Sequence, residues 1–258
     1  MFGIVPRVLW KQRMPPDKRN RVHLGLNCLL IRTGHEILLV DTGCGRKYSA
    51  KERDIYGIGR ESDIVSGLAS LGLGPGDVDL VINTHLHFDH CGGNTRWEGD
   101  EAVPTFPNAT YIVAMQDYAT GIDRNERTAA SYRPENWVPL EERGQLQVLE
   151  GEKEIVSGVS LVHTPGHTPG HHSVKVQAGD KTVFYLADLC PTIAHVPLPW
   201  IMGYDLLPLT TLETRKRIYP QAVEEAWLLF FEHDPQVVAG YMKQKDDKFV
   251  LEPAEWKD

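Results

Sequence analysis

The run THLHFDHCGG (84–93) places three histidines and one aspartate within six residues: His85, His87, Asp89 and His90. Imidazole and carboxylate groups are common ligands of zinc and similar divalent ions. In an extended stretch, residues 85 and 87 point to the same side and can reach one ion. The adjacent residues 89 and 90 diverge and can reach another. The run is therefore either a metal site or a polar turn in which histidines happen to cluster.

Three further candidate ligands decide between these alternatives. His167 follows the apolar run VSLVHTPG, Asp188 ends VFYLA, and His233 follows LLFFE. If these runs are strands that end at the same edge, their ligands meet there. Five histidines and two aspartates are more than one tetrahedral zinc uses, and they suit two ions about 3.5–4 Å apart. The sequence therefore predicts a two-metal site.

Apolar runs bounded by turn residues predict the strands that carry these ligands. A strand pair is expected within 26–43 around a turn at 33–35, and helices at 62–73 and at 220–227, the latter beginning at Pro220. Strands grouped toward both ends of the chain, with helices between, favour sheets packed on each other with helices outside. The other expected strands are 77–85, 111–115, 146–150, 159–164, 173–176, 181–188, 228–234 and 237–240.

Two segments lack a regular pattern. Residues 116–145 are rich in Arg, Asn, Pro and Glu, which is typical of a surface insertion or a lid. Residues 189–210 are rich in proline yet apolar, so they are a candidate pocket wall. Its wall-forming side chains would be Pro197, Leu198, Trp200, Ile201 and Met202, although Trp200 and Ile201 could equally belong to the core.

Bulk properties exclude several classes of protein. The chain has 258 residues, 27 basic and 35 acidic, with a net charge of -8, which disfavours nucleic acid as a partner. A signal peptide and a membrane span are both lacking from the sequence pattern, so a cytoplasmic protein without a membrane partner is expected. The four cysteines form no CxxC pair and are expected to be free, small, buried residues.

Taken in order, HLHFDH, TPGHTPGHH, an aspartate ending an apolar strand and FFEHD resemble the metallo-β-lactamase superfamily. DTG (41–43) is a further family feature, and the likeness extends over about residues 25–240. It implies an α/β fold, the αββα sandwich, as a single domain over 1–258. Within the superfamily, the chain is most similar to the branch of quorum-quenching lactonases and methyl parathion hydrolases.

The resemblance also implies the roles of the ligands. His85, His87 and His167 would bind the first metal, while Asp89, His90 and His233 would bind the second. Asp188 would bridge the two ions, and Asp41 would orient the site through hydrogen bonds. The cofactors would be two divalent ions, zinc foremost, with Mn, Fe or Co as alternatives.

Such a site performs hydrolysis with a metal-bridging hydroxide, which Asp89 would orient and whose proton it would pass on. Among the superfamily's activities the sequence favours a lactonase that acts on acyl-homoserine lactones. Phosphotriesterase and thioesterase activities stay open, as does a metal-binding module without catalysis. The partners expected are a small lactone, ester or phosphotriester substrate and, from the resemblance, a second copy in a homodimer.

One departure from the lactonase pattern concerns the third residue after the bridging aspartate. Lactonases place a tyrosine there that assists the carbonyl oxygen, whereas this chain has Pro191. His195 and Tyr204 are the candidate catalytic substitutes. The remaining histidines are expected to be polar supports or surface residues: His23, His35, His163, His171 and His172.

Overall fold

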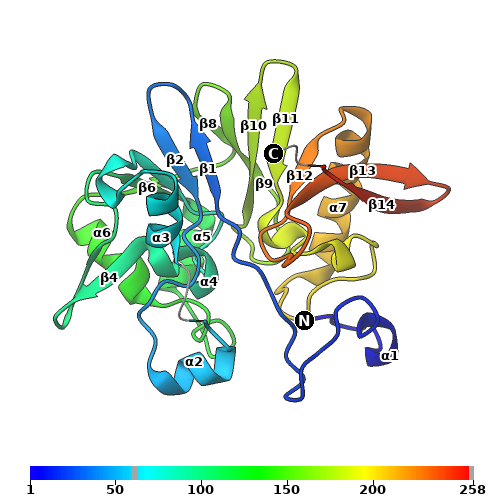
Figure 1. Cartoon of the computed structure of the whole chain (residues 1–258), viewed down its shortest axis with the longest axis horizontal. Helices are drawn as coiled ribbons and strands as arrows, with labels where there is room; N and C mark the ends of the chain where they lie inside the picture. The colour runs from blue at the N-terminus through cyan, green and yellow to red at the C-terminus, as the bar shows by residue number, and fades with distance from the viewer. Residues whose placement is uncertain (60–62, 256–258) are drawn as a thin grey trace. The chain divides into compact units, whose positions relative to one another are not determined.

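The computed structural model describes residues 1–59 and 63–255. It divides into two compact units, one made of Met1–Asn27 and Gly151–Asp258 and the other of Cys28–Glu150. Each unit contains one large β-sheet (Figure 1). The expectation of a single domain over 1–258 stays a prediction.

The sheet of the unit Cys28–Glu150 has five strands in the order β1-β2-β3-β6-β7. β1 and β2 form the antiparallel pair expected around the turn at 33–35, and the other pairings are parallel. Buried apolar side chains on both sides of β2 and β3 suit strands in the middle of a covered sheet. The strands are β1 (Leu29–Arg32), β2 (Ile37–Val40), β3 (Leu80–Ile82), β6 (Thr110–Ala114) and β7 (Leu146–Leu149).

Short helices and one hairpin complete this unit. α3 lies within the helix expected over 62–73, of which Ser62 is outside the described residues. The expectation of an irregular segment over 116–145 is wrong in part, because two helices lie there. The elements are α2 (Ala50–Tyr56), α3 (Ile64–Ser70), η1 (Pro75–Asp77), α4 (Phe88–Cys91), η2 (Gly92–Asn94), β4 (Thr95–Glu98), β5 (Glu101–Pro104), α5 (Met115–Ile122), η3 (Pro134–Asn136) and α6 (Val138–Glu142).

The other unit has a seven-stranded sheet in the order β14-β13-β12-β11-β10-β9-β8. Its pairings are antiparallel except for β11 with β12. The strands are β8 (Lys153–Val156), β9 (Val159–His163), β10 (His172–Ala178), β11 (Lys181–Tyr185), β12 (Leu228–Phe230), β13 (Ala239–Lys245) and β14 (Lys248–Pro253). Three short helices also belong to this unit: α1 (Arg7–Trp10), η4 (Ala187–Leu189) and η5 (Ile193–His195).

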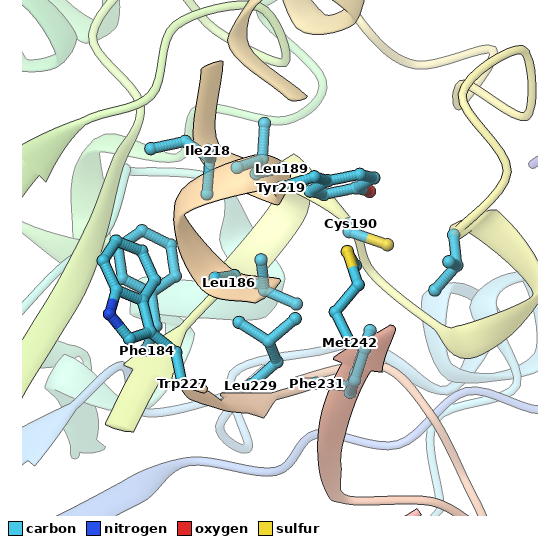
Figure 2. Close-up of a cluster of buried hydrophobic side chains, with 12 residues drawn as sticks. Phe184, Leu186, Leu189, Cys190, Ile218, Tyr219, Trp227, Leu229, Phe231 and Met242 are labelled. Carbon is cyan, nitrogen blue, oxygen red and sulfur yellow. The ribbon is translucent and has the colours of Figure 1, made fainter. Parts of the chain in front are cut away.

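One helix differs from its sequence-based expectation. α7 spans Pro208–Glu224, so Pro208 and not Pro220 is at its start, and Pro220 lies inside it. Its buried side chains Ile218 and Tyr219 pack with Phe184 and Leu229 in the core of this unit (Figure 2). Together with the buried Ala222 beyond Pro220, they stabilise the helix on both sides of a residue that normally ends one.

The apolar segment 189–210 is irregular up to the start of α7, as expected, with only a short 3-10 turn inside it. Along the described part of the chain, helices are too short or too polar to cross a bilayer.

Candidate metal centre

In the unit Cys28–Glu150, the motif HLHFDH (85–90) lies just after the end of β3. The chain leaves β3 at Ile82, runs extended through His85 and His87, and turns into α4. His85, His87 and His90 are buried, whereas Asp89 is partly exposed. The Nε2 atom of His90 lies 4.0 Å from Oδ1 of Asp89, so these two neighbours face a common point. An extended stretch followed at once by a helical turn thus separates the first pair of ligands from the second.

Asp41 orients this motif through hydrogen bonds to Thr84 and His90. Its Oδ1 accepts a hydrogen bond from the backbone N–H of Thr84 at 2.8 Å, and its Oδ2 accepts from the Thr84 hydroxyl at 2.8 Å. The Nδ1 of His90 donates to the same Oδ2 at 3.0 Å. Asp41 is fully buried and has a φ of 57°, a strained conformation for a residue with a side chain. The carboxylate therefore holds the motif through three hydrogen bonds, and its supporting role at a metal site stays a prediction.

A second buried carboxylate supports the same motif. Asp117 on α5 accepts from the backbone N–H of Leu86 at 2.6 Å and from the Tyr132 hydroxyl at 2.8 Å. The Tyr132 ring in turn packs edge-on against His87, with ring centroids 4.7 Å apart. Neither residue was identified from the sequence. Their contacts with Leu86 and His87 join positions about 30 residues or more apart, which no local pattern reveals.

The glycines that close the motif allow two backbone segments to touch. A Cβ at Gly92 would lie 2.1 Å from the carbonyl oxygen of Cys44, and one at Gly93 would lie 2.3 Å from that of Thr42. Lys47 ties the same loop by donating to the carbonyl oxygens of Gly92 and Thr95. Burial lowers the pKa of Lys47 to about 8. The GG pair is therefore a packing requirement of the loop that follows the ligands.

The other unit contributes the remaining three candidate ligands. Asp188 lies just after β11, and its two carboxylate oxygens face two different imidazoles. Oδ2 lies 3.0 Å from Nε2 of His167, and Oδ1 lies 3.2 Å from Nε2 of His233. All three side chains are nearly fully buried. The carboxylate thus presents one oxygen to each of two imidazoles.

Each of these imidazoles is held by its other nitrogen. The Nδ1 of His167 donates to Oδ1 of Asp205 at 3.0 Å, and the Nδ1 of His233 donates to the carbonyl oxygen of Gly25 at 3.0 Å. Burial alone would lower the pKa of His167, but the carboxylates of Asp188 and Asp205 outweigh it and raise it to about 10. Asp205 was not identified from the sequence.

His171 positions Asp188. Its Nδ1 lies 3.0 Å from the carbonyl oxygen of Thr164, and its Nε2 accepts from the backbone N–H of Asp188 at 3.1 Å. It is thus a polar support, as expected, and so are His163 and His172, whose rings contact carbonyl oxygens of Pro169 and Gly170. His23 and His35 are exposed, also as expected.

The two candidates for catalysis outside the ligand set occupy different environments. His195 is fully buried, stacks on Phe2 at a centroid distance of 4.6 Å and shares a hydrogen bond with Thr192. Burial and the nearby Arg215 lower its pKa to about 3. Tyr204 is 62% exposed. A catalytic role for either stays a prediction.

The four cysteines form no disulfide, and three of them, Cys44, Cys91 and Cys190, are buried. Burial raises the pKa of the Cys91 and Cys190 thiols, which disfavours their thiolates. The expectation of small buried residues is confirmed for these three.

Comparison with known proteins places these ligand sets in context. The model of the metallo-beta-lactamase superfamily matches residues 23–245. An N-acyl homoserine lactonase of Bacillus thuringiensis is 30% identical over 226 residues, which cover 83% of this chain and 82% of the lactonase. The family match spans both candidate ligand sets and Asp41.

Solved structures extend the likeness to three dimensions. A probable metal-dependent hydrolase from Staphylococcus aureus has a TM-score of 0.88 and 29% identity, covering 99% of this chain and 92% of that one. An N-acyl homoserine lactone hydrolase with N-hexanoyl-L-homoserine bound at its catalytic metal center has a TM-score of 0.66 and 28% identity, covering 83% and 82%. The expected α/β fold, the αββα sandwich, is confirmed.

Proposed function

Because this chain belongs to the metallo-β-lactamase superfamily, we propose that it is a two-metal hydrolase that opens acyl-homoserine lactones. It is a hydrolase of that superfamily, with lactonases among its relatives. The proposal adds the number of metals, the role of each residue and the substrate.

The observation that carries the proposal is the orientation of the imidazoles. In His90, His167 and His233, Nδ1 donates to an oxygen of the protein. The Nδ1 of His85 likewise lies 3.1 Å from the Thr84 hydroxyl. Hydrogen bonds of this kind fix the ring and identify Nε2 as the atom offered to a metal. The donor set, imidazole nitrogen with carboxylate oxygen, fits zinc and its neighbours in the first transition row.

In this proposal the seven candidate ligands serve one pair of ions. His85, His87 and His167 hold one ion, Asp89, His90 and His233 hold the other, and Asp188 belongs to both. Each of these two sets has at least three imidazole or carboxylate side chains, the number that a metal ion requires of the protein. The divergent contacts of the two Asp188 oxygens support its bridging role.

When bound, two such ions supply a hydroxide at neutral pH and polarise the carbonyl oxygen of the substrate. The protein residues do the rest. Asp89, the only partly exposed ligand of its motif, orients the nucleophile and carries a proton to the leaving alkoxide. Asp41, Asp205 and His171 keep the ligands fixed through the hydrogen bonds described above, so that no reorganisation is needed during the reaction.

Support for the lactone as substrate comes from the named relatives and from the segment 189–210. Pro197 and Ile201 are partly exposed apolar residues that suit an acyl chain, whereas Leu198 packs against the core of its unit. Trp200 packs with Phe2 and the Arg13 guanidinium, and Met202 is buried, so these two serve the core of their unit.

Because Pro191 stands where lactonases have a tyrosine, a second candidate function is retained, that of a phosphotriesterase or a thioesterase. Where lactonases have an assisting phenol, this position has no side-chain donor. His195 and Tyr204 are the substitutes proposed for the lactonase reaction, and Tyr204 has the more accessible side chain.

The experiment is to measure ring opening of N-hexanoyl-homoserine lactone by zinc-loaded protein, with a chelated sample as control. Phosphotriester and thioester substrates are measured in parallel. The proposal requires chelator-sensitive opening with a kcat/KM above that for the other two classes. Faster turnover of either other class with two metals bound would move the function there, and absence of all turnover would favour a metal-binding module. Zinc as the native metal, a homodimer and a cytoplasmic location remain parts of the proposal.

A further inference from the structure

Phe88 lies between the proposed ligands His87 and Asp89 and belongs to a group of aromatic side chains. The Tyr56 ring is 5.0 Å from it and the Tyr48 ring 6.0 Å, measured between centroids. The Tyr48 hydroxyl also donates to the Phe88 carbonyl oxygen at 3.3 Å. Tyr56 is 44% exposed and Phe88 is partly exposed, so the group presents apolar surface directly beside the ligands.

Arg133 is the cation of this group. Its guanidinium carbon lies 4.7 Å from the centre of the Tyr48 ring and 5.5 Å from that of Phe88. Its Nη2 lies 2.9 Å from Oε1 of Glu52 on α2. A planar guanidinium can stack on aromatic rings and pair with a carboxylate at the same time, which an ammonium group does less well. Arg133 therefore joins α2 to the rings at the ligand motif.

The two carboxylate oxygens of Glu52 contact different partners, one at the start of α2 and the other on Arg133. Oε2 accepts from the backbone N–H and the hydroxyl of Ser49, at 2.8 and 2.7 Å, which completes the capping box of α2. Oε1 faces Arg133. None of the seven residues of α2 is buried, so this helix has no anchor in a hydrophobic core. Its position depends on Arg133, on the ring contact of its own last residue Tyr56 and on the contacts of the preceding Tyr48.

The backbone around Arg133 is fixed to the motif itself. The N–H of Phe88 donates to the Ser131 carbonyl oxygen at 2.9 Å, and His87 pairs with Tyr132 in an isolated β-bridge. Arg133 thus extends from a segment that is attached to the ligands toward a helix that has little attachment of its own.

We infer that Arg133 is a positioning residue that sets substrate specificity. By holding α2 against Phe88, it fixes an aromatic face that receives the apolar group of the substrate, which in the proposed reaction is the acyl chain of the lactone. This inference rests on the proposed function for the identity of the apolar group. The attachment of α2 by Arg133 does not depend on it.

The test compares Arg133→Met and Arg133→Lys with the unaltered protein, all loaded with zinc. Steady-state kinetics use N-butanoyl- and N-decanoyl-homoserine lactone, and hydrogen exchange is followed by mass spectrometry in peptides that cover 49–58. Arg143→Met is the matched control, because it removes an arginine that pairs with Glu101 on the surface of the same unit.

We expect Arg133→Met to raise the KM for the decanoyl substrate about tenfold, with kcat nearly unchanged and little effect on the butanoyl substrate. Exchange in 49–58 should become faster, with metal content unchanged. Arg133→Lys should recover part of the decanoyl KM, and Arg143→Met should resemble the unaltered protein.

Equal losses for both substrates, or a loss of zinc, would overturn the inference and make Arg133 a purely structural residue. Unchanged exchange in 49–58 would overturn the attachment of α2. If the unaltered protein opens no lactone, the proposed function fails. The same variants are then compared on short and long thioesters, and a uniform response across chain lengths overturns the specificity role.

Discussion

Asp205 holds His167 by a hydrogen bond of 3.0 Å between Oδ1 and Nδ1, while the Thr211 hydroxyl donates to the other oxygen of Asp205 at 2.6 Å. Thr211, Asp205 and His167 are therefore linked by two consecutive hydrogen bonds, which fix the imidazole ring of His167 with its Nε2 facing Asp188. His167 is the proposed ligand in which this support is most direct, since its two nitrogens lie between two carboxylates.

The first prediction concerns this support. Asp205→Asn keeps the size of the side chain, but its amide cannot accept from both Nδ1 of His167 and the hydroxyl of Thr211. We expect zinc affinity to fall about 10- to 100-fold, the usual effect of removing such a partner. Competition with a chromophoric chelator measures it. Glu213→Gln, an exposed change on α7, is the control and should bind zinc as the unaltered protein does. Unchanged affinity in Asp205→Asn would remove Asp205 from the site.

The second prediction concerns the ligands themselves. His85→Ala and Asp188→Ala should each bind less than the full two equivalents of metal and lose most hydrolytic activity, while the chain still folds. Elemental analysis gives the metal content, and circular dichroism verifies folding. Two equivalents of metal together with full turnover in either variant would refute the ligand assignment.

The sequence was sufficient to place the ligand residues at strand ends because their positions are local. HLHFDH follows the run that forms β3 after two residues, and Asp188 follows the run that forms β11 after two residues as well. The order of short apolar runs and breakers also predicted most strands of both sheets. These features depend on residues that are adjacent in the sequence, so periodicity and turn residues are enough to recognise them.

The supporting residues could not be predicted in the same way. Asp117 contacts Leu86 across 31 positions, and Asp205 contacts His167 across 38. Both lie in segments without a strong pattern of their own. The start of α7 was misplaced for a related reason, because Pro220 has the character of a first helical residue and only core packing extends the helix through it. Residues whose role depends on a tertiary contact are thus the ones that sequence patterns miss.

The third prediction uses Gly92. Gly92→Ala would put a Cβ 2.1 Å from the Cys44 carbonyl oxygen, a backbone atom that cannot move without displacing the DTG segment. We expect a loss of about 3 kcal/mol or more in the free energy of unfolding, comparable to overpacking at a rigid site. Urea denaturation measures it. Gly67→Ala is the control, because Gly67 lies on α3 with nothing within 4 Å of the added methyl group and should be neutral or stabilising by up to about 1 kcal/mol. Equal stability of the two variants would contradict the close packing at Gly92.

The fourth prediction is a pH dependence that originates at Lys47. Burial lowers its pKa from 10.5 to about 8 in the folded chain, so between these values the unfolded chain binds the proton and the folded chain has released it. Stability contributed by this group must therefore rise with pH from about 8 to 10.5. Lys47→Met, which nearly preserves the length of the side chain, abolishes that contribution. The difference in unfolding free energy between Lys47→Met and the unaltered protein should shift in favour of the unaltered protein as the pH is raised from 7.5 to 9.5. Urea denaturation at each pH, with zinc held constant, gives this difference. A difference that stays constant over the range would show that Lys47 keeps its proton, held by the carbonyl oxygens of Gly92 and Thr95.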